Sequence, residues 1–215
     1  MPTDGDTPRA RRSLDKGRME AFSDGIFGVA ATLLVVDIAV HPPGSPLHQF
    51  LAAWPSYVAY VVSFLTVGAA WLAHSELTDR LERTDAIFLR LNLLLLLVVA
   101  FLPFPTRLVA DALQDVDRER LAVTVYGPTL LAINLLGFVL YAYAKREGLY
   151  KSEREGESLE RQEGRHMVRV VIGYAVAILV GLALPELAVA LYFAVAVYLV
   201  VPFREVRQLL FGRGQ

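Results

Sequence analysis

Residues Ala21–Val40 read AFSDGIFGVAATLLVVDIAV, and HPPG follows them at His41–Gly44. A helix rises about 1.5 Å per residue, so about 20 apolar residues cross the ~30 Å hydrocarbon core of a bilayer. Two consecutive prolines and a glycine are typical of a helix end. The preceding segment Met1–Gly17 is polar and basic, and the apolar run is longer than the core of a cleaved signal peptide. We therefore predict that Ala21–Val40 is a retained transmembrane helix.

Similar apolar runs fill the rest of the 215-residue chain, which is 55% hydrophobic and has a mean hydropathy of +0.45. Five more spans are predicted, at roughly Phe50–Ala73, Ile87–Pro105, Leu121–Ala144, Met167–Leu184 and Leu187–Pro202. A helix satisfies its backbone hydrogen bonds internally, as lipid requires, and the sequence lacks the short alternating segments of a membrane barrel. The sequence predicts an all-α integral membrane protein with six transmembrane helices per subunit.

Lys and Arg residues gather on one set of span flanks, namely the N-terminus, the segments after spans two and four, and the C-terminal tail. They are Arg9, Arg11, Arg12, Lys16, Arg18, Arg80, Arg83, Lys145, Arg146, Lys151, Arg154, Arg161, Arg165, Arg169, Arg204, Arg207 and Arg213. The opposite flanks carry only Arg107, Arg118 and Arg120. The positive-inside rule therefore places both termini in the cytoplasm. The expected division is a cytoplasmic segment 1–18, a six-helix transmembrane domain 19–205 and a cytoplasmic tail 206–215.

Composition excludes several kinds of chemistry. The chain has no cysteine, so it holds no disulfide, thiolate nucleophile or Cys-ligated metal. Its basic residues border spans and lie among acids, without a DNA-reading motif, so no nucleic-acid partner is expected. The segment Lys145–Arg165 is typical of a solvated connector. His41, His48 and His166 lie in or beside predicted loops without paired ligand spacing. We expect no metal site, no cofactor and no enzymatic activity.

The foot of the first span is polar. Arg18, Glu20, Ser23 and Asp24 lie within about two helical turns, with Glu20 and Asp24 on one side of the helix. One interpretation is a snorkelling arginine with acids favoured by the helix dipole. The other is a fixed polar network that holds the helix foot and lines a cation entrance, where a carboxylate would raise the local cation concentration.

Further along this span, Val29, Leu33 and Val36 form one apolar stripe at the spacing i, i+4, i+7. Small residues, namely Gly25, Gly28, Ala30, Ala31 and Thr32, surround it. Such residues let membrane helices approach closely. The stripe is either ordinary packing or lipid contact, or a narrow apolar constriction of the kind that gates a pore by dewetting.

Polar residues also mark the second and third spans. Trp71 is typical of an interface aromatic, and one interpretation of His74 is a solvated loop residue. Arg90 lies about four residues into an apolar span, beside Asn92. It either snorkels toward the cytoplasm or pairs with an acid such as Asp24 or Glu76.

These residues together resemble a known family. Arg18-x-x-x-Phe22-Ser23-Asp24, followed by small and aliphatic residues through Thr32, resembles the signature of the transmembrane protein 175 family, which comprises lysosomal potassium channels and shorter bacterial relatives. Trp71-x-x-His74 and the stretch from Asn92 to Leu102-Pro103-Phe104-Pro105-Thr106 look like its second- and third-span motifs. The last three spans match only in general character.

The resemblance implies a homotetramer in which the first helix of each subunit lines a central pore. It implies that the constriction consists of Val29, Leu33 and Val36, with Thr32 beside it helping to hydrate the ion. It also implies that Arg18, Ser23, Asp24, Trp71 and His74 form a structural polar network at the cytoplasmic side. The first constriction residue is commonly Ile in the family, and Val29 is one methylene shorter, a departure that affects pore width and selectivity but not the pore itself.

We therefore expect a homotetrameric, potassium-permeable cation channel in a bacterial plasma membrane, with the bilayer, monovalent cations and its own copies as partners. The alternatives are a proton pathway or secondary transporter that uses Asp24, His74 and Arg90, a membrane-embedded enzyme, and a non-conducting scaffold subunit. A transporter typically has interrupted spans in related halves, and only Pro103 and Pro105 hint at such interruptions.

Overall fold

The structure is a computed structural model that describes residues 16–36, 45–112, 116–151 and 168–200. Its labelled helices are α1 (Lys16–Val36), α2 (Pro46–Ala52), α3 (Trp54–Asp79), α4 (Ala86–Phe101), α5 (Pro103–Ala112), α6 (Val116–Arg146) and α8 (Pro185–Val200). A further helix covers Val168–Gly181. The predicted stop at His41–Gly44 and the tail 206–215 lie outside the described residues, as do most of the segment 1–18 and of the connector Lys145–Arg165.

Four of the described helical segments are long and apolar enough to cross a bilayer: Lys16–Val36, Ser56–Asp79, Ala86–Ala110 and Thr124–Arg146. The apolar helices that correspond to the last two predicted spans have fewer than 18 residues within the described ranges. The predicted all-α class is thus confirmed for the described residues, and its long helices fit a bilayer, whereas the count of six spans stays a prediction.

The second and third spans differ in their boundaries from the predicted ones. The second span was expected from Phe50, but residues 46–52 form the separate helix α2, which begins at Pro46 with Ser45 as its N-cap. Helix α3 begins at Trp54 and runs to Asp79, six residues beyond the predicted end at Ala73. The third span is divided at Leu102 into α4 and α5, because Pro103 has no N–H to continue the helical ladder.

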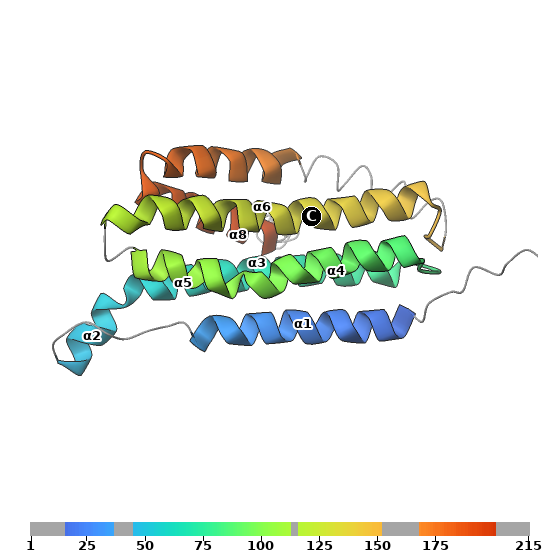
Figure 1. Cartoon of the computed structure of the whole chain (residues 1–215), viewed down its shortest axis with the longest axis horizontal. Coiled ribbons are helices and arrows are strands. Elements are labelled where there is room, and N and C mark those ends of the chain that lie inside the picture. The colour runs from blue at the N-terminus through green and yellow to red at the C-terminus, as the bar shows by residue number, and fades with distance from the viewer. Residues whose placement is uncertain (1–15, 37–44, 113–115, 152–167, 201–215) are drawn as a thin grey trace, which may run out of the picture.

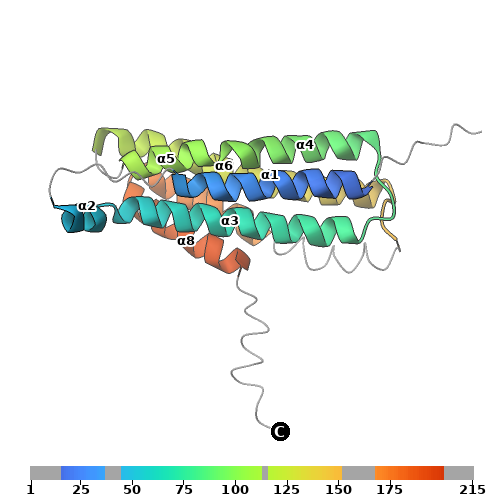
Figure 2. The same ribbon diagram turned by 90° about the horizontal axis from the view of Figure 1, so that it is seen from below.

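The helices form a layered bundle with α1 at one edge. In Figure 1, α1 lies below the other long helices, and α6 and the helix Val168–Gly181 lie on the opposite side. Figure 2 shows α1 in front, flanked by α3 on one side and by α4 and α5 on the other. Since α1 contacts α3 and α4, only one side of it faces the bundle.

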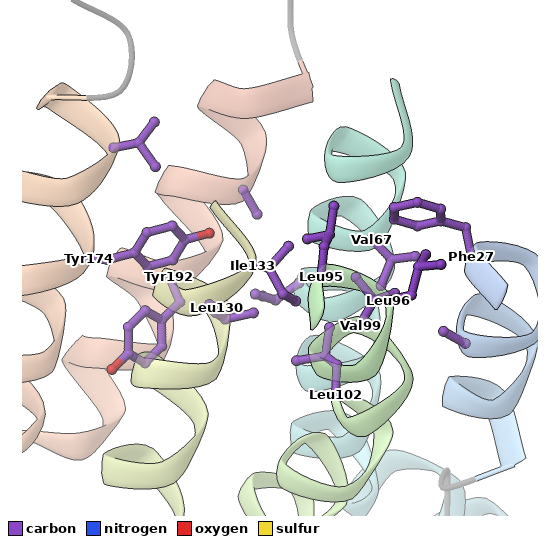
Figure 3. Close-up of a cluster of buried hydrophobic side chains, with 14 of the residues drawn as sticks. Phe27, Val67, Leu95, Leu96, Val99, Leu102, Leu130, Ile133, Tyr174 and Tyr192 are labelled. Atoms are coloured by element: carbon purple, nitrogen blue, oxygen red, sulfur yellow. The ribbon is translucent and has the colours of Figure 1, made fainter. Parts of the chain in front are cut away.

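The interior is a continuous apolar core that joins these layers. Figure 3 shows Phe27 of α1 beside Val67 of α3, with Leu95 and Leu96 of α4 between them and α6. Tyr192 of α8 continues the core on the far side of α6. Burial of these side chains positions α1, so its other face remains uncovered in a single chain.

The end of the bundle that the positive-inside rule makes cytoplasmic is tied together by backbone and side-chain bonds. Asp85 caps α4 by accepting hydrogen bonds from the backbone N–H groups of Ile87 and Phe88. The segments before α4 and after α6 meet in an isolated bridge between Leu81 and Tyr150. These contacts fix the level at which α3 and α6 end and α4 begins.

Candidate functional site

The outward face of α1 carries the predicted constriction residues. Val29, Leu33 and Val36 expose 55%, 46% and 75% of their surface in the single chain. On the opposite face, Phe27 and Leu34 expose 2% and 1% and pack in the core. The helix therefore presents an aliphatic stripe away from its own subunit, where it is available to line a space or to contact another molecule.

Small residues flank this stripe. Gly25 and Gly28 are exposed, and a Cβ atom added at either position would meet nothing within 4 Å. Thr32 is exposed as well, and its hydroxyl donates a 2.9 Å hydrogen bond to the carbonyl oxygen of Val29. Because Gly25 and Gly28 have no side chains, another helix can approach α1 closely on the N-terminal side of the stripe.

A hydrogen bond from a residue of α3 holds the carboxylate of Asp24. The indole Nε1 of Trp71 donates a hydrogen bond of 2.9 Å to Oδ1 of Asp24, and both residues are exposed. One oxygen of the carboxylate is thereby oriented, while the charge stays at the surface of the subunit.

Behind Asp24 runs a buried chain of hydrogen bonds that links three helices. His74 Nε2 on α3 lies 2.8 Å from Oδ1 of Asn92 on α4, and Asn92 Nδ2 donates to Ser23 Oγ on α1 at 2.9 Å. Ser23 Oγ in turn donates to the Met19 carbonyl oxygen at 2.9 Å. His74, Asn92 and Ser23 expose 5% or less of their surface.

The direction of this chain follows from its last member. Because the Ser23 hydrogen goes to the Met19 carbonyl, the serine oxygen accepts from the amide NH₂ of Asn92. The amide oxygen of Asn92 therefore faces His74, whose Nε2 must carry a hydrogen to satisfy it. Each hydrogen in this chain therefore points toward the foot of α1, from His74 to Asn92 and from Asn92 to Ser23.

The structure brings together four of the five residues of the predicted polar network. Ser23, Asp24, Trp71 and His74 lie together at the contact of α1, α3 and α4. Arg18 is exposed and makes no hydrogen bond or salt bridge with a described residue. The interpretation of His74 as a solvated loop residue is wrong, because α3 continues past it and buries it.

Two further expectations concern partners. Arg90 pairs with neither Asp24 nor Glu76: the described contacts of Asp24 and Glu76 are with Trp71 and Arg80, respectively. Within the described ranges, no three His, Asp or Glu residues gather closely enough to hold a metal.

Asn92 is a polar residue in an apolar run of the sequence, but its central place in the network is not predicted from the sequence.

A second buried polar cluster was missed. Ser63 Oγ on α3 lies 2.8 Å from both Thr106 Oγ1 on α5 and the Tyr126 hydroxyl on α6. All three residues are buried. Single hydroxyls in apolar runs give little signal in a sequence, and only their convergence from three helices makes a cluster.

The family comparison matches residues 18–103 to the model described as endosomal/lysosomal potassium channel TMEM175. A potassium channel of Streptomyces collinus is 35% identical over 187 residues, which are 86% of this chain and 91% of that protein. The human endosomal/lysosomal proton channel TMEM175 is 30% identical over 156 residues, which are 67% of this chain and 30% of the human protein.

A solved structure shares the fold. The crystal structure of a lysosomal potassium-selective channel TMEM175 homologue from Chamaesiphon minutus matches with a TM-score of 0.73 and 33% identity. The match covers 86% of this chain and 95% of that one. The region of similarity includes α1, α3 and α4, which together form the candidate site.

Proposed function

The chain belongs to the TMEM175 family of ion channels, and from that premise we propose that it is a homotetrameric, potassium-permeable cation channel in the plasma membrane of a bacterium. Six spans with both termini in the cytoplasm form each subunit, and the segments 1–18 and 206–215 flank the channel domain 19–205. Permeant K⁺ is the only ligand that the function requires. The expected partners are the bilayer, monovalent cations and further copies of the chain.

One observation carries the proposal. The helix at the edge of the bundle exposes the aliphatic stripe Val29, Leu33 and Val36, while its other face is fixed in the core. In a closed fourfold ring, four such helices facing the axis enclose a narrow apolar neck. Gly25 and Gly28 let the helices approach below that neck.

The proposed ion path has two parts. Cations gather at the cytoplasmic mouth near Asp24, which attracts them through its negative charge. They then pass the neck at Val29, Leu33 and Val36, where an apolar wall makes a narrow passage prone to dewetting. Thr32, beside the stripe, offers a hydroxyl oxygen to an ion that has lost part of its hydration. Modest selectivity follows, because no ring of carbonyls replaces the hydration shell.

The polar residues behind the neck have a positioning role in this proposal. Trp71 and His74 hold the foot of α1 through Asp24 and through Asn92 and Ser23. Arg18 lies nearest the cytoplasm among the predicted network residues, at the entrance of the path. The position of the α1 stripe on the pore axis then depends on contacts that lie outside the pore.

The test is potassium flux into liposomes that contain the purified protein. Leu33→Ala widens the neck and is expected to raise flux, whereas Leu33→Asp adds a charge that hydrates the neck and changes ion preference. Leu93→Ala on the exposed face of α4 is a matched control, because it removes a similarly exposed leucine away from α1. Flux that ignores both Leu33 variants would refute this neck, and a folded protein without flux would refute the channel.

Proton conduction is a second candidate function. It is favoured by the polarised chain from His74 through Asn92 to Ser23, which lies beside Asp24. The human relative named above is described as a proton channel. A pH-sensitive dye inside the same liposomes measures proton entry without K⁺. A proton current that persists in Leu33→Asp but falls in Asn92→Leu would mean that protons move along the hydrogen bonds from His74 to Ser23. A parallel change of the K⁺ and proton currents would mean that protons cross the neck.

A further inference from the structure

Arg90 occupies an unusual position on α4. It lies in the fifth position of the candidate span Ala86–Ala110, and its side chain is exposed. The exposed residues on the same face of the helix are otherwise apolar. They are Ile87, Leu93, Leu94, Leu97 and Phe101. A single guanidinium thus lies at the cytoplasmic end of an apolar stripe that faces away from the subunit core.

No described acid neutralises this charge. Arg90 forms no salt bridge with a described carboxylate, and Glu76 on α3 pairs with Arg80 on its own helix. An arginine within a membrane span is costly unless it finds a partner or reaches the interface. Its long side chain lets it snorkel to the depth of the lipid phosphates.

We propose that Arg90 and the stripe beyond it bind an anionic phospholipid of the cytoplasmic leaflet. The guanidinium pairs with the phosphate, for which its planar fork of N–H donors is suited. The inference uses the membrane orientation of the proposed function but not its pore. The exposed Arg83, in the segment that precedes α4, adds positive charge at the same membrane face.

The dimensions of the stripe fit one leaflet. At 1.5 Å per residue, Leu97 lies about 10 Å and Phe101 about 16 Å beyond Arg90 along the helix. Half of the ~30 Å hydrocarbon core is about 15 Å. An acyl chain of a lipid whose phosphate meets Arg90 therefore reaches along Leu93 and Leu97 toward Phe101, so headgroup and chain are both accommodated.

The experiment is lipid titration of the purified full-length protein in a neutral detergent, followed by native mass spectrometry. Phosphatidylglycerol is compared with phosphatidylcholine, and glycerol phosphate tests the headgroup without chains. Wild type is compared with Arg90→Gln and with Arg146→Gln, which removes the same charge from an exposed side chain at the end of α6. Arg90→Gln replaces an exposed charge with a less polar group, so folding is expected to survive, and a melting curve checks this.

We expect wild type and Arg146→Gln to retain phosphatidylglycerol in preference to phosphatidylcholine, and Arg90→Gln to lose about fivefold in apparent affinity. Glycerol phosphate is expected not to compete, because it lacks the chains. Equal losses in both arginine variants, or full competition by glycerol phosphate, would overturn the site. Dissociation of the oligomer by Arg90→Gln without change in lipid retention would instead assign Arg90 to a carboxylate of a neighbouring subunit. None of these readouts requires ion flux, so the lipid site and the channel fail independently.

Discussion

The indole Nε1 of Trp71 on α3 donates a 2.9 Å hydrogen bond to Oδ1 of Asp24 on α1. The two residues are 47 positions apart in the chain, and their contact connects the exposed face of α1 with the helix that supports it. One turn further along α3, His74 begins the buried chain through Asn92 to Ser23. The foot of α1 is therefore held by an exposed bond to a carboxylate and by a buried neutral chain.

Trp71→Phe is expected to lower the stability of the folded protein by about 1 kcal/mol, because it removes one exposed hydrogen bond to a charged acceptor and keeps most of the ring. Thermal unfolding in detergent measures this, and K⁺ flux in liposomes is expected to fall as Asp24 loses its orientation. Trp54→Phe is the matched control: it lies on the same helix, is exposed, and donates no hydrogen bond to a described residue. Equal losses in both variants would mean that the Asp24 contact has no part in the effect.

Asn92→Leu is expected to lower the stability of the folded protein more than Trp71→Phe does. It leaves the buried His74 Nε2 without its partner, and such an unsatisfied group costs about 1–3 kcal/mol. Ser23→Ala removes the other end of the chain, yet His74 keeps its bond. The double variant should lose less than the sum of the two, since both single variants break the same Asn92–Ser23 bond. Strict additivity in denaturation measurements would show that this bond contributes no coupling.

The helical class and the outward stripe could be predicted because a bilayer imposes simple rules on a sequence. Runs of about 20 apolar residues mark spans, and a period of 3.6 places Val29, Leu33 and Val36 on one face. Their exposure in the single chain agrees with that periodicity. The roles assigned to these residues rest on the family resemblance and stay predictions until flux is measured.

Contacts between helices could not be predicted in the same way. An apolar span carries no marker of its neighbours, so the pairing of Asn92 with His74 and Ser23, and of Ser63 with Thr106 and Tyr126, appears only in three dimensions. The predicted end of α3 at Ala73 is too early, because the polar residues that follow Ala73 are typical of a loop. There, Glu76 and Arg80 form an i,i+4 pair, which favours continuation of the helix.

Gly127→Ala is expected to destabilise the contact between α6 and α8. A Cβ atom at this position would lie 2.2 Å from the hydroxyl of buried Tyr192 and 2.6 Å from Cγ1 of partly buried Ile178 on the helix Val168–Gly181, so these side chains must shift. Overpacking of this kind typically costs about 1–3 kcal/mol. Melting in detergent measures the loss, and Gly137→Ala is the control on the same helix, because its Cβ would meet nothing within 4 Å.

Combining Gly127→Ala with Tyr192→Phe tests the cause. Removal of the hydroxyl relieves the shortest contact, whereas the Tyr192 ring carbon at 2.9 Å and Ile178 remain. The double variant is therefore expected to recover part of the stability that Gly127→Ala loses. A double variant that is less stable than Gly127→Ala alone would show that the clash with the hydroxyl is not the source of the defect.

Val29→Ile is expected to narrow the proposed neck, because it adds one methylene to an exposed stripe residue without changing its apolar character. Ions would then shed more hydration water, so total flux should fall while the preference for K⁺ over Na⁺ rises, by about tenfold, which is the lower end of what one methylene contributes to discrimination. Reversal potentials under bi-ionic conditions measure the preference. Val35→Ile is the control, since Val35 is similarly exposed on α1 but lies outside the stripe. If Val35→Ile shifts the preference as much as Val29→Ile, the added bulk acts through general packing of α1 and the first constriction residue is not Val29.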